Sequence, residues 1–147
     1  MSQQLTIVMY HYVRELASTR YPEIKGLLIT QFKEQLCYLE KYYQFVTIDD
    51  CLDCLINKIP LPSNACLLTF DDAFIDHFIT VFPLLEEKRI QGCFFPPARA
   101  ILSQEVLDVH KIHFILATTS YKIKNLIQDI YACLDKYREQ FQLEKNS

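Results

Sequence analysis

The chain lacks the features that mark several classes of protein. It has no tryptophan and only two glycines and six prolines in 147 residues, which argues against a disordered or low-complexity chain. Its net charge is −3, so it has no basic surplus and nucleic acid is not an expected partner. It contains no apolar run of about 18 residues or more, so no segment is expected to span a membrane.

A secretory signal and a cysteine framework are also missing. The opening residues, MSQQLTIVMYHYV, have neither the charged segment nor the small-residue cleavage site of a signal peptide, so we expect a cytoplasmic protein by default. Cys51 and Cys54 form the one Cys-x-x-C pair, and no second pair follows at zinc-finger spacing. We therefore expect the six cysteines to be reduced and largely buried.

What the chain has is a large apolar and aromatic content. Half of its residues are hydrophobic, including ten phenylalanines and nine tyrosines. This content is enough to bury the core of one domain. Short apolar runs indicate strands, and longer amphipathic segments indicate helices. We expect strands over 5–13, 44–48, 65–70 and 92–95, and helices over 30–43, 49–58, 73–90 and from 103 onward.

Local signals refine this pattern. Thr30 is the expected N-cap of the first helix, and Thr47 with Asp50 resembles a capping box for the second. Pro83 is expected to kink or restart the third helix. Strands that alternate with helices predict an α/β fold with a largely parallel sheet. In such sheets functional side chains gather where the strands end at their C-terminal side.

Two adjacent acids, Asp71 and Asp72, end the strand in the segment LLTFDDAF. Two neighbouring carboxylates repel each other unless something offsets their charge. One interpretation is that a cation keeps both ionised while one of them accepts a proton. The other is that Asp72 caps the next helix and Asp71 is solvated. His11 follows the first strand run and is expected at the same edge of the sheet.

Three segments together resemble one protein family. LLTFDDAF resembles the T-F-D-D motif of the polysaccharide deacetylases (carbohydrate esterase family four, the NodB homology domain), although Ala73 replaces the usual glycine. IVMYHYV resembles the opening strand of that family, an apolar run that ends in M-Y-H-x-V. GCFFPP resembles the strand that follows. The order and spacing of the three segments agree with the family over residues 5 to 97.

The resemblance implies a partial, distorted (β/α) barrel with a helical C-terminal segment. It assigns residues 1–102 to a deacetylase-like part and 103–147 to a helical extension of the same domain. It also implies metal-dependent removal of N-acetyl groups from a glycan. Asp71 would be the general base that activates water, and Asp72 would bind a divalent metal, usually zinc. His11 would lie at the floor or rim of the site, near the substrate.

The sequence departs from the family after the first motif. The family completes its metal site with H-[ST]-x-x-H, and the nearest match here is VHKIHF, in which His110 and His113 are three apart and Lys111 replaces the Ser or Thr. We therefore favour packing over metal binding for His110 and His113. The family's later arginine, tryptophan and histidine motifs are missing as well.

These gaps leave several functions open. We favour the N-terminal part of a longer deacetylase, with little activity alone, over a degenerate copy of the whole. The alternative is a non-catalytic carbohydrate-binding or interaction domain on the same fold. A phosphotransfer domain is disfavoured because it needs acids on separate strand ends and a lysine on another. An incomplete barrel would expose an apolar sheet edge, which predicts self-association.

Overall fold

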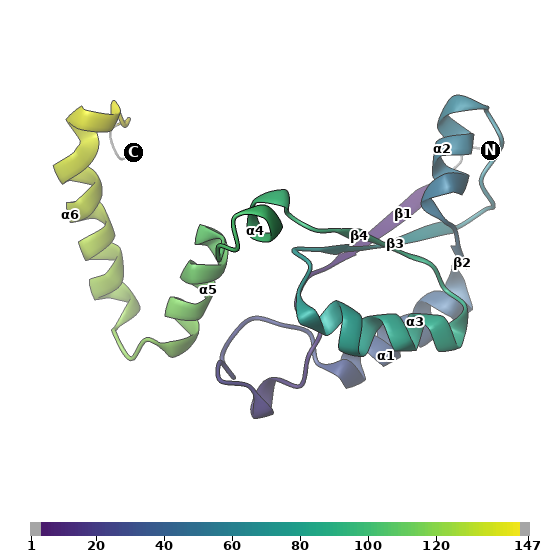
Figure 1. Cartoon of the computed structure of the whole chain (residues 1–147), viewed down its shortest axis with the longest axis horizontal. Coiled ribbons are helices and arrows are strands. Elements are labelled where there is room, and N and C mark those ends of the chain that lie inside the picture. The colour runs from purple at the N-terminus through teal and green to yellow at the C-terminus, as the bar shows by residue number, and fades with distance from the viewer. Residues whose placement is uncertain (1–3, 145–147) are drawn as a thin grey trace. The chain divides into compact units, whose positions relative to one another are not determined.

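A computed structural model describes residues 4–144 of the chain. The chain forms two compact units, residues 1–117 and 118–147. The elements of the first are β1 (Leu5–Tyr10), η1 (Leu16–Ser18), α1 (Ile29–Tyr42), β2 (Gln44–Phe45), α2 (Ile48–Ile56), β3 (Ala65–Asp71), η2 (His77–Val81), α3 (Phe82–Lys88), β4 (Gly92–Phe95), α4 (Ala98–Leu102) and α5 (Asp108–Thr118), which ends at the unit boundary (Figure 1). The second unit contains α6 (Ile123–Phe141).

The sheet is built around β3, and every pairing in it is parallel. β1 pairs with β3 along its whole length, from Leu5 opposite Ala65 to Tyr10 opposite Phe70. The other edge of β3 is shared, because β2 pairs with its first residues and β4 with its last ones, up to Asp71 opposite Phe95. The predicted α/β fold with a parallel sheet is therefore confirmed. β2 is shorter than expected because α2 begins at Ile48.

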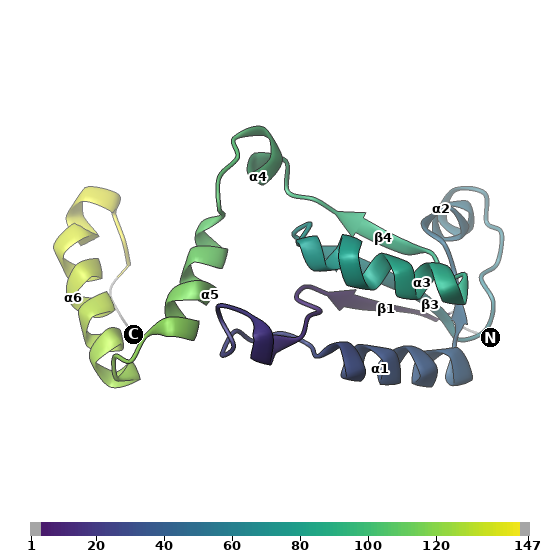
Figure 2. The ribbon, with the colours of Figure 1, turned by 60° about the horizontal axis from the view of Figure 1, so that its bottom comes forward.

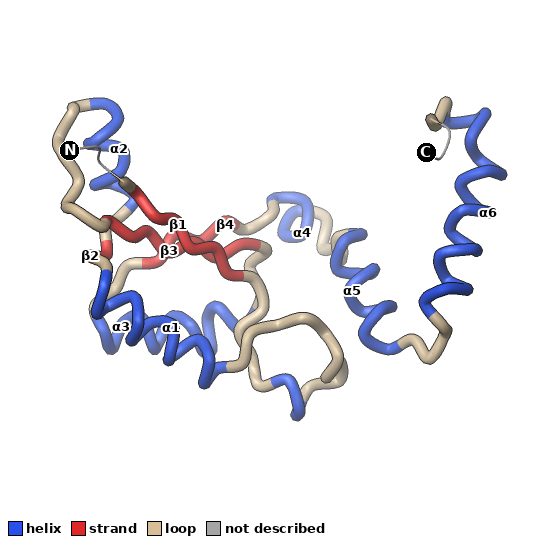
Figure 3. The backbone as a smooth tube through the Cα atoms, turned by 180° about the vertical axis from the view of Figure 1, so that it is seen from behind, coloured by secondary structure: helices blue, strands red, loops and turns tan. Residues whose placement is uncertain are grey.

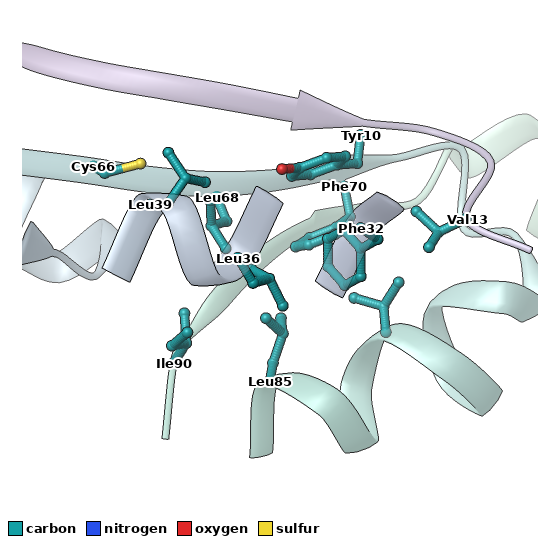
Figure 4. Packing of buried hydrophobic residues seen from close by; sticks show 11 residues of the cluster. Tyr10, Val13, Phe32, Leu36, Leu39, Cys66, Leu68, Phe70, Leu85 and Ile90 are labelled. Carbon is teal, nitrogen blue, oxygen red and sulfur yellow. The ribbon is translucent and has the colours of Figure 1, made fainter. Parts of the chain in front are cut away.

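The main core lies between the sheet and the helices α1 and α3, which run side by side along one face of the sheet (Figures 1–3). Phe70 is fully buried at its centre, with its ring 5.3 Å from Tyr10 and 4.9 Å from Phe94. α1 contributes Phe32 and Leu36, both fully buried (Figure 4). The alternation of side chains along β3 sends every second residue into this core.

The opposite face of the sheet is only partly covered. A smaller cluster around Cys51 of α2 packs on Ala65 and Leu67. Farther along β1, Ile7 and Met9 are 57% and 58% exposed. Neighbouring residues of a strand point to opposite faces, so these side chains lie on the face away from α1 and α3. The described residues thus leave an apolar strip of β1 open to solvent.

The starts of α2 and α1 test the two predicted N-caps. The Thr47 hydroxyl accepts a hydrogen bond from the Asp50 N–H, and the Asp50 carboxylate accepts one from the Thr47 N–H, so the capping box is confirmed. The prediction for Thr30 was wrong, because α1 begins at Ile29 and the Gln31 side chain accepts a hydrogen bond from the Leu28 N–H instead.

The helical segment before β4 contains a wide turn. Residues 77–81 form a π-helix, η2, which continues directly into α3. Pro83 lies just after this turn and has no N–H to donate to the preceding turn, which explains why the α-helical hydrogen-bond pattern is replaced there. The prediction that Pro83 alters the helix is confirmed.

From residue 103 onward the described chain is helical as expected, in two separate helices, α5 and α6. α6 ends where Gln142 adopts a left-handed conformation. The boundary between the compact units falls at 117/118, whereas the expected division at 102/103 concerned the extent of the deacetylase-like part and stays a prediction. Within residues 4–144, none of the helices combines the length and apolarity that crossing a membrane requires.

Candidate functional site

The ends of β1 and β3 bring the first site residues together. Because Tyr10 lies opposite Phe70, the residues that follow them, His11 and the two acids, leave the sheet at the same edge. His11 Nε2 lies 3.8 Å from Asp72 Oδ2, and the side chains are 41% and 21% exposed. The parallel register therefore places His11 beside the acids, as the sequence predicted.

The two acids do not occupy equivalent positions. Asp71 is the last residue of β3, partly exposed, and its place in the alternation puts it on the same face as Thr69, away from the main core. Asp72 has left the strand, with φ at 75°, and its N–H donates to the Phe95 carbonyl, 3.2 Å away. The helical turn begins at residue 75, so Asp72 is too far upstream to be its N-cap.

Asp72 faces a histidine from far along the chain. His110 Nε2 of α5 lies 3.1 Å from Asp72 Oδ2. The side chain of His110 is 8% exposed and packs against the Phe74 ring, 4.9 Å away. Despite its closeness to Asp72, the buried Nε2 forms no hydrogen bond with any residue that the structure describes. A buried imidazole nitrogen without such a bond, aimed at a carboxylate, is an arrangement that a bound cation would satisfy.

His113, three residues later, has a different neighbour. Its Nδ1 lies 3.3 Å from the Tyr12 hydroxyl, and its ring centre is 6.3 Å from that of His110. Residues three apart share one face of a helix, so both histidines lie on the face of α5 that contacts Asp72 and Tyr12. The structure thus brings His110 to Asp72 and leaves His113 on Tyr12.

His77 contacts the backbone of His11. It is 4% exposed, and its Nε2 lies 2.6 Å from the His11 carbonyl oxygen, to which it donates when that nitrogen is protonated. Its ring also packs against Phe70 and Phe94. The apolar neighbours of His77 in FIDHF favour packing, but no local pattern points to a partner 66 positions away.

An ion pair between Arg14 and Asp76, which the sequence does not predict, lies next to the site. Arg14 Nε donates to Asp76 Oδ2 over 2.6 Å, and the two side chains are 19% and 7% exposed. The guanidinium also lies over the Tyr12 ring, 4.7 Å from its centre. Tyr12 in turn stacks on Phe74 at 4.0 Å. No local pattern links Arg14 to Asp76, because the two residues are 62 positions apart in the chain.

The same surroundings change the acidity of Tyr12. Burial is the largest cause and raises the pKa of its hydroxyl. The negative charges of Asp72 and Asp76 raise the pKa further, while Arg14 acts in the opposite direction. Tyr12 is therefore neutral throughout the physiological range and keeps its proton for hydrogen bonding.

An apolar hollow of about 270 Å³ opens beside the acids. Its lining residues are largely aromatic: Ala73, Phe74, His77, Phe78, Phe82, Phe94 and Pro96. Ala73 directly follows Asp72, so the hollow borders the polar site. It offers an apolar wall close to the carboxylates.

The donor set suits a metal only in part. Carboxylate oxygen and imidazole nitrogen are ligands that zinc accepts, and Asp72 with His110 supplies one of each. Within residues 4–144, however, no group of three or more His, Cys, Asp or Glu side chains is arranged to hold a metal ion. A catalytic zinc site commonly has three protein ligands. Among the described residues, Asp72 and His110 thus bring together two side chains of the types that zinc accepts, one fewer than such a site commonly has.

Ala73 carries backbone strain at the site, and its replacement gives a testable prediction. Its φ is 52°, a left-handed conformation that disfavours residues with a Cβ. We expect Ala73→Gly to raise the free energy of unfolding by up to about 1 kcal/mol, because glycine adopts this conformation without steric cost. Urea denaturation followed by circular dichroism measures the change.

The matched control is Ala98→Gly in α4, where the backbone is helical. This variant should lose stability, because glycine is unfavourable in a helix. A loss of stability in Ala73→Gly as well would contradict the assignment of strain to residue 73.

The chain matches no protein-family model and no curated protein. It is similar to solved structures that include IcaB from Ammonifex degensii, with 32% sequence identity over 67% of this chain and a TM-score of 0.57. A de-N-acetylase from Aggregatibacter actinomycetemcomitans has 21% identity over 63% of this chain and a TM-score of 0.54. The Streptococcus pyogenes deacetylase PplD, in complex with acetate, has 20% identity over 74% of this chain and a TM-score of 0.53.

These similarities concern part of each neighbour. The chain spans 40% of the length of IcaB, 37% of the de-N-acetylase and 50% of PplD. At identities near 20%, the two deacetylases share the fold with this chain. The similarities support a polysaccharide deacetylase-like fold for the chain.

Proposed function

We propose that the chain carries part of the active site of a hydrolase that removes acetyl groups from an N-acetylated glycan with the help of a divalent metal. The observation that carries this proposal is the approach of the buried His110 Nε2 to Asp72 Oδ2 at the C-terminal edge of the sheet. A second carboxylate, Asp71, immediately precedes Asp72 in the chain. The similarity to deacetylase structures agrees with this choice.

Asp72 and His110 would hold the metal, for which zinc fits the mixed oxygen and nitrogen donors. A bound divalent metal polarises an acetamide carbonyl and lowers the pKa of a bound water. The Asp72 carboxylate would supply an oxygen ligand and His110 an imidazole nitrogen. His11, more exposed and 3.8 Å from the same carboxylate oxygen, would border the substrate.

Asp71 would act as the general base. In the proposed reaction, the oxygen of a water molecule bonds to the acetamide carbon while Asp71 accepts a proton from that water. The carbon–nitrogen bond then breaks, the proton passes to the departing amine, and acetate and a free amino sugar are formed. The Asp71 residue is partly exposed, so water and a substrate would have access to it.

We also propose that the sheet and helices form part of a distorted (β/α) barrel. The chain spans half or less of the structures that it resembles, so turnover by residues 1–147 alone is expected to be low. The alternative, a non-catalytic carbohydrate-binding domain, would use the aromatic hollow beside Ala73 and would not need the acids.

Acetate release tests the proposal. The protein is incubated with zinc chloride and an N-acetylglucosamine oligosaccharide, and acetate is measured by an enzyme-coupled assay. We expect slow, zinc-dependent release that is lost in Asp71→Asn and retained in Asp49→Asn, an exposed acid of α2 with the same change of charge. Oligosaccharide binding that is unaffected by chelators, with no acetate in any sample, would favour the non-catalytic alternative.

A second copy of the chain is the partner that we propose for the open side of β1. Among the described strands, β1 pairs only with β3, so its other edge has no partner strand there. Ile7, a residue of β1, is 57% exposed. Two such edges related by a twofold axis pair with each other in a closed dimer.

Sedimentation velocity measures this association. We expect a concentration-dependent dimer that Ile7→Lys abolishes and that Ile101→Lys, a change at an equally exposed position in α4, leaves intact. A monomer at every concentration would refute the proposed dimer.

A further inference from the structure

α5 is attached to the rest of its unit by a narrow stripe of side chains. His110 is buried on this stripe, and His113 and Phe114 are partly buried. On its other sides the helix is exposed, with Ile112 at 54% and Ile115 at 56%. A helix with so little buried surface gains little from packing, so the few contacts of this stripe decide where it lies. They are the Phe114 ring, 4.6 Å from the Tyr21 ring, and individual polar contacts.

One of these polar contacts joins α5 to the residue after His11. The Tyr12 hydroxyl lies 3.3 Å from His113 Nδ1, and the two rings meet edge to face at 5.9 Å. Tyr12 is 5% exposed. The hydroxyl is neutral and can donate to Nδ1 when the proton of the His113 ring is on Nε2.

Tyr12 is itself held firmly. One side of its ring stacks on Phe74, and the Arg14 guanidinium lies over the ring as well. The ion pair with Asp76 fixes Arg14 in turn. Phe74 and Asp76 belong to the segment that follows Asp72, so Tyr12 is positioned by the same piece of chain that carries the acids. These contacts therefore restrict the position of the Tyr12 hydroxyl relative to Asp72.

We propose that Tyr12 is a positioning residue, whose hydroxyl holds His113 and thereby sets α5 at the place where His110 faces Asp72. The two histidines then have separate tasks. His113 attaches the helix, and His110, one turn earlier on the same face, is presented to the carboxylate. The part of this inference that concerns metal binding rests on the proposed function.

The test compares two tyrosine variants. Tyr12→Phe keeps the ring stacked on Phe74 and removes only the hydroxyl. The matched control is Tyr10→Phe, which removes a hydroxyl that donates to Gln35 Oε1 of α1 at 3.0 Å. Two properties are measured for each protein: the affinity for zinc by calorimetry, and the exchange rates of the amide hydrogens of α5 by NMR.

We expect Tyr12→Phe to weaken zinc binding about three- to tenfold and to speed amide exchange in α5 by a similar factor, as the loss of one hydrogen bond implies. Tyr10→Phe should change neither property. His113→Phe should act like Tyr12→Phe, and the double variant should be no weaker than either single one. His113→Asn, which keeps a polar group near the Tyr12 hydroxyl, should recover part of the affinity.

The outcomes separate this inference from the proposed function. If the unmodified chain binds no zinc, the proposed function fails. Faster amide exchange of α5 in Tyr12→Phe, but not in Tyr10→Phe, would still support the attachment of α5 by the Tyr12 hydroxyl. Unchanged exchange and unchanged affinity in Tyr12→Phe overturn the inference. Faster exchange with full zinc affinity also overturns it, because the hydroxyl would then hold α5 without positioning His110.

Discussion

Asp72→Asn is expected to lower the zinc affinity of the chain by more than about 100-fold. Loss of an outer-shell partner of a metal ligand already costs 10- to 100-fold, and this change removes the charge of a ligand itself. It also leaves His110 Nε2 facing a neutral amide in place of a carboxylate. Asp71→Asn, in contrast, is expected to retain the affinity within about threefold, because Asp71 is assigned a proton rather than the metal.

Calorimetric zinc titrations of the two variants beside Asp49→Asn measure this difference. Asp49 is exposed in the first turn of α2, so this variant controls for the lost charge. Equal losses of zinc in Asp71→Asn and Asp72→Asn would contradict the division of roles. Full zinc affinity in Asp72→Asn would place the metal elsewhere and remove the basis of the proposed function.

Phe70→Ala is expected to destabilise the first unit by about 3 to 5 kcal/mol. Phe70 is fully buried on β3, and its ring contacts aromatic rings of β1, α1 and β4. Removing it would leave a cavity between the sheet and α1, where these three rings meet. Because domains of this size are stable by only about 5 to 15 kcal/mol, we expect a large fraction of the variant to lose its fold on mild heating.

Urea denaturation followed by circular dichroism measures the loss. Phe78→Ala is the control, since Phe78 is 72% exposed and its truncation should change stability by no more than about 0.5 kcal/mol. Similar losses in both variants would mean that Phe78 is covered in solution, which a dimer or a bound partner would explain. A small loss in Phe70→Ala alone would contradict the described core.

The parts of the fold that local patterns determine were predictable from the sequence. β4 begins and ends as expected, and the reciprocal bonds of Thr47 and Asp50 follow from their spacing. The parallel sheet followed from the alternation of strands and helices, and with it the meeting of His11 and Asp72. These features depend on neighbours in the sequence or on a general rule of sheet construction.

The contacts of α5 were not predictable in the same way. His110 faces Asp72 because a helix far along the chain is attached through His113 and Tyr12, and no local pattern records that attachment. The spacing of three between the histidines argued for packing, since it differs from the spacing of four in the resembled motif. The position of His110 beside Asp72 is determined by contacts between segments that are distant in the sequence. Metal binding by His110 stays a prediction.

The wide turn of η2 has a consequence for how this segment tolerates changes in length. A π-helical turn contains one residue more than the α-helical turn it replaces, and each helical residue adds about 100° of rotation. Deleting one residue from 78–80 would let the segment close as an ordinary α-helix and rotate α3 relative to His77. Val81 and Leu85 could then no longer fill the core while His77 reaches the His11 carbonyl. One inserted residue thus allows a single helix to serve both the core and the site.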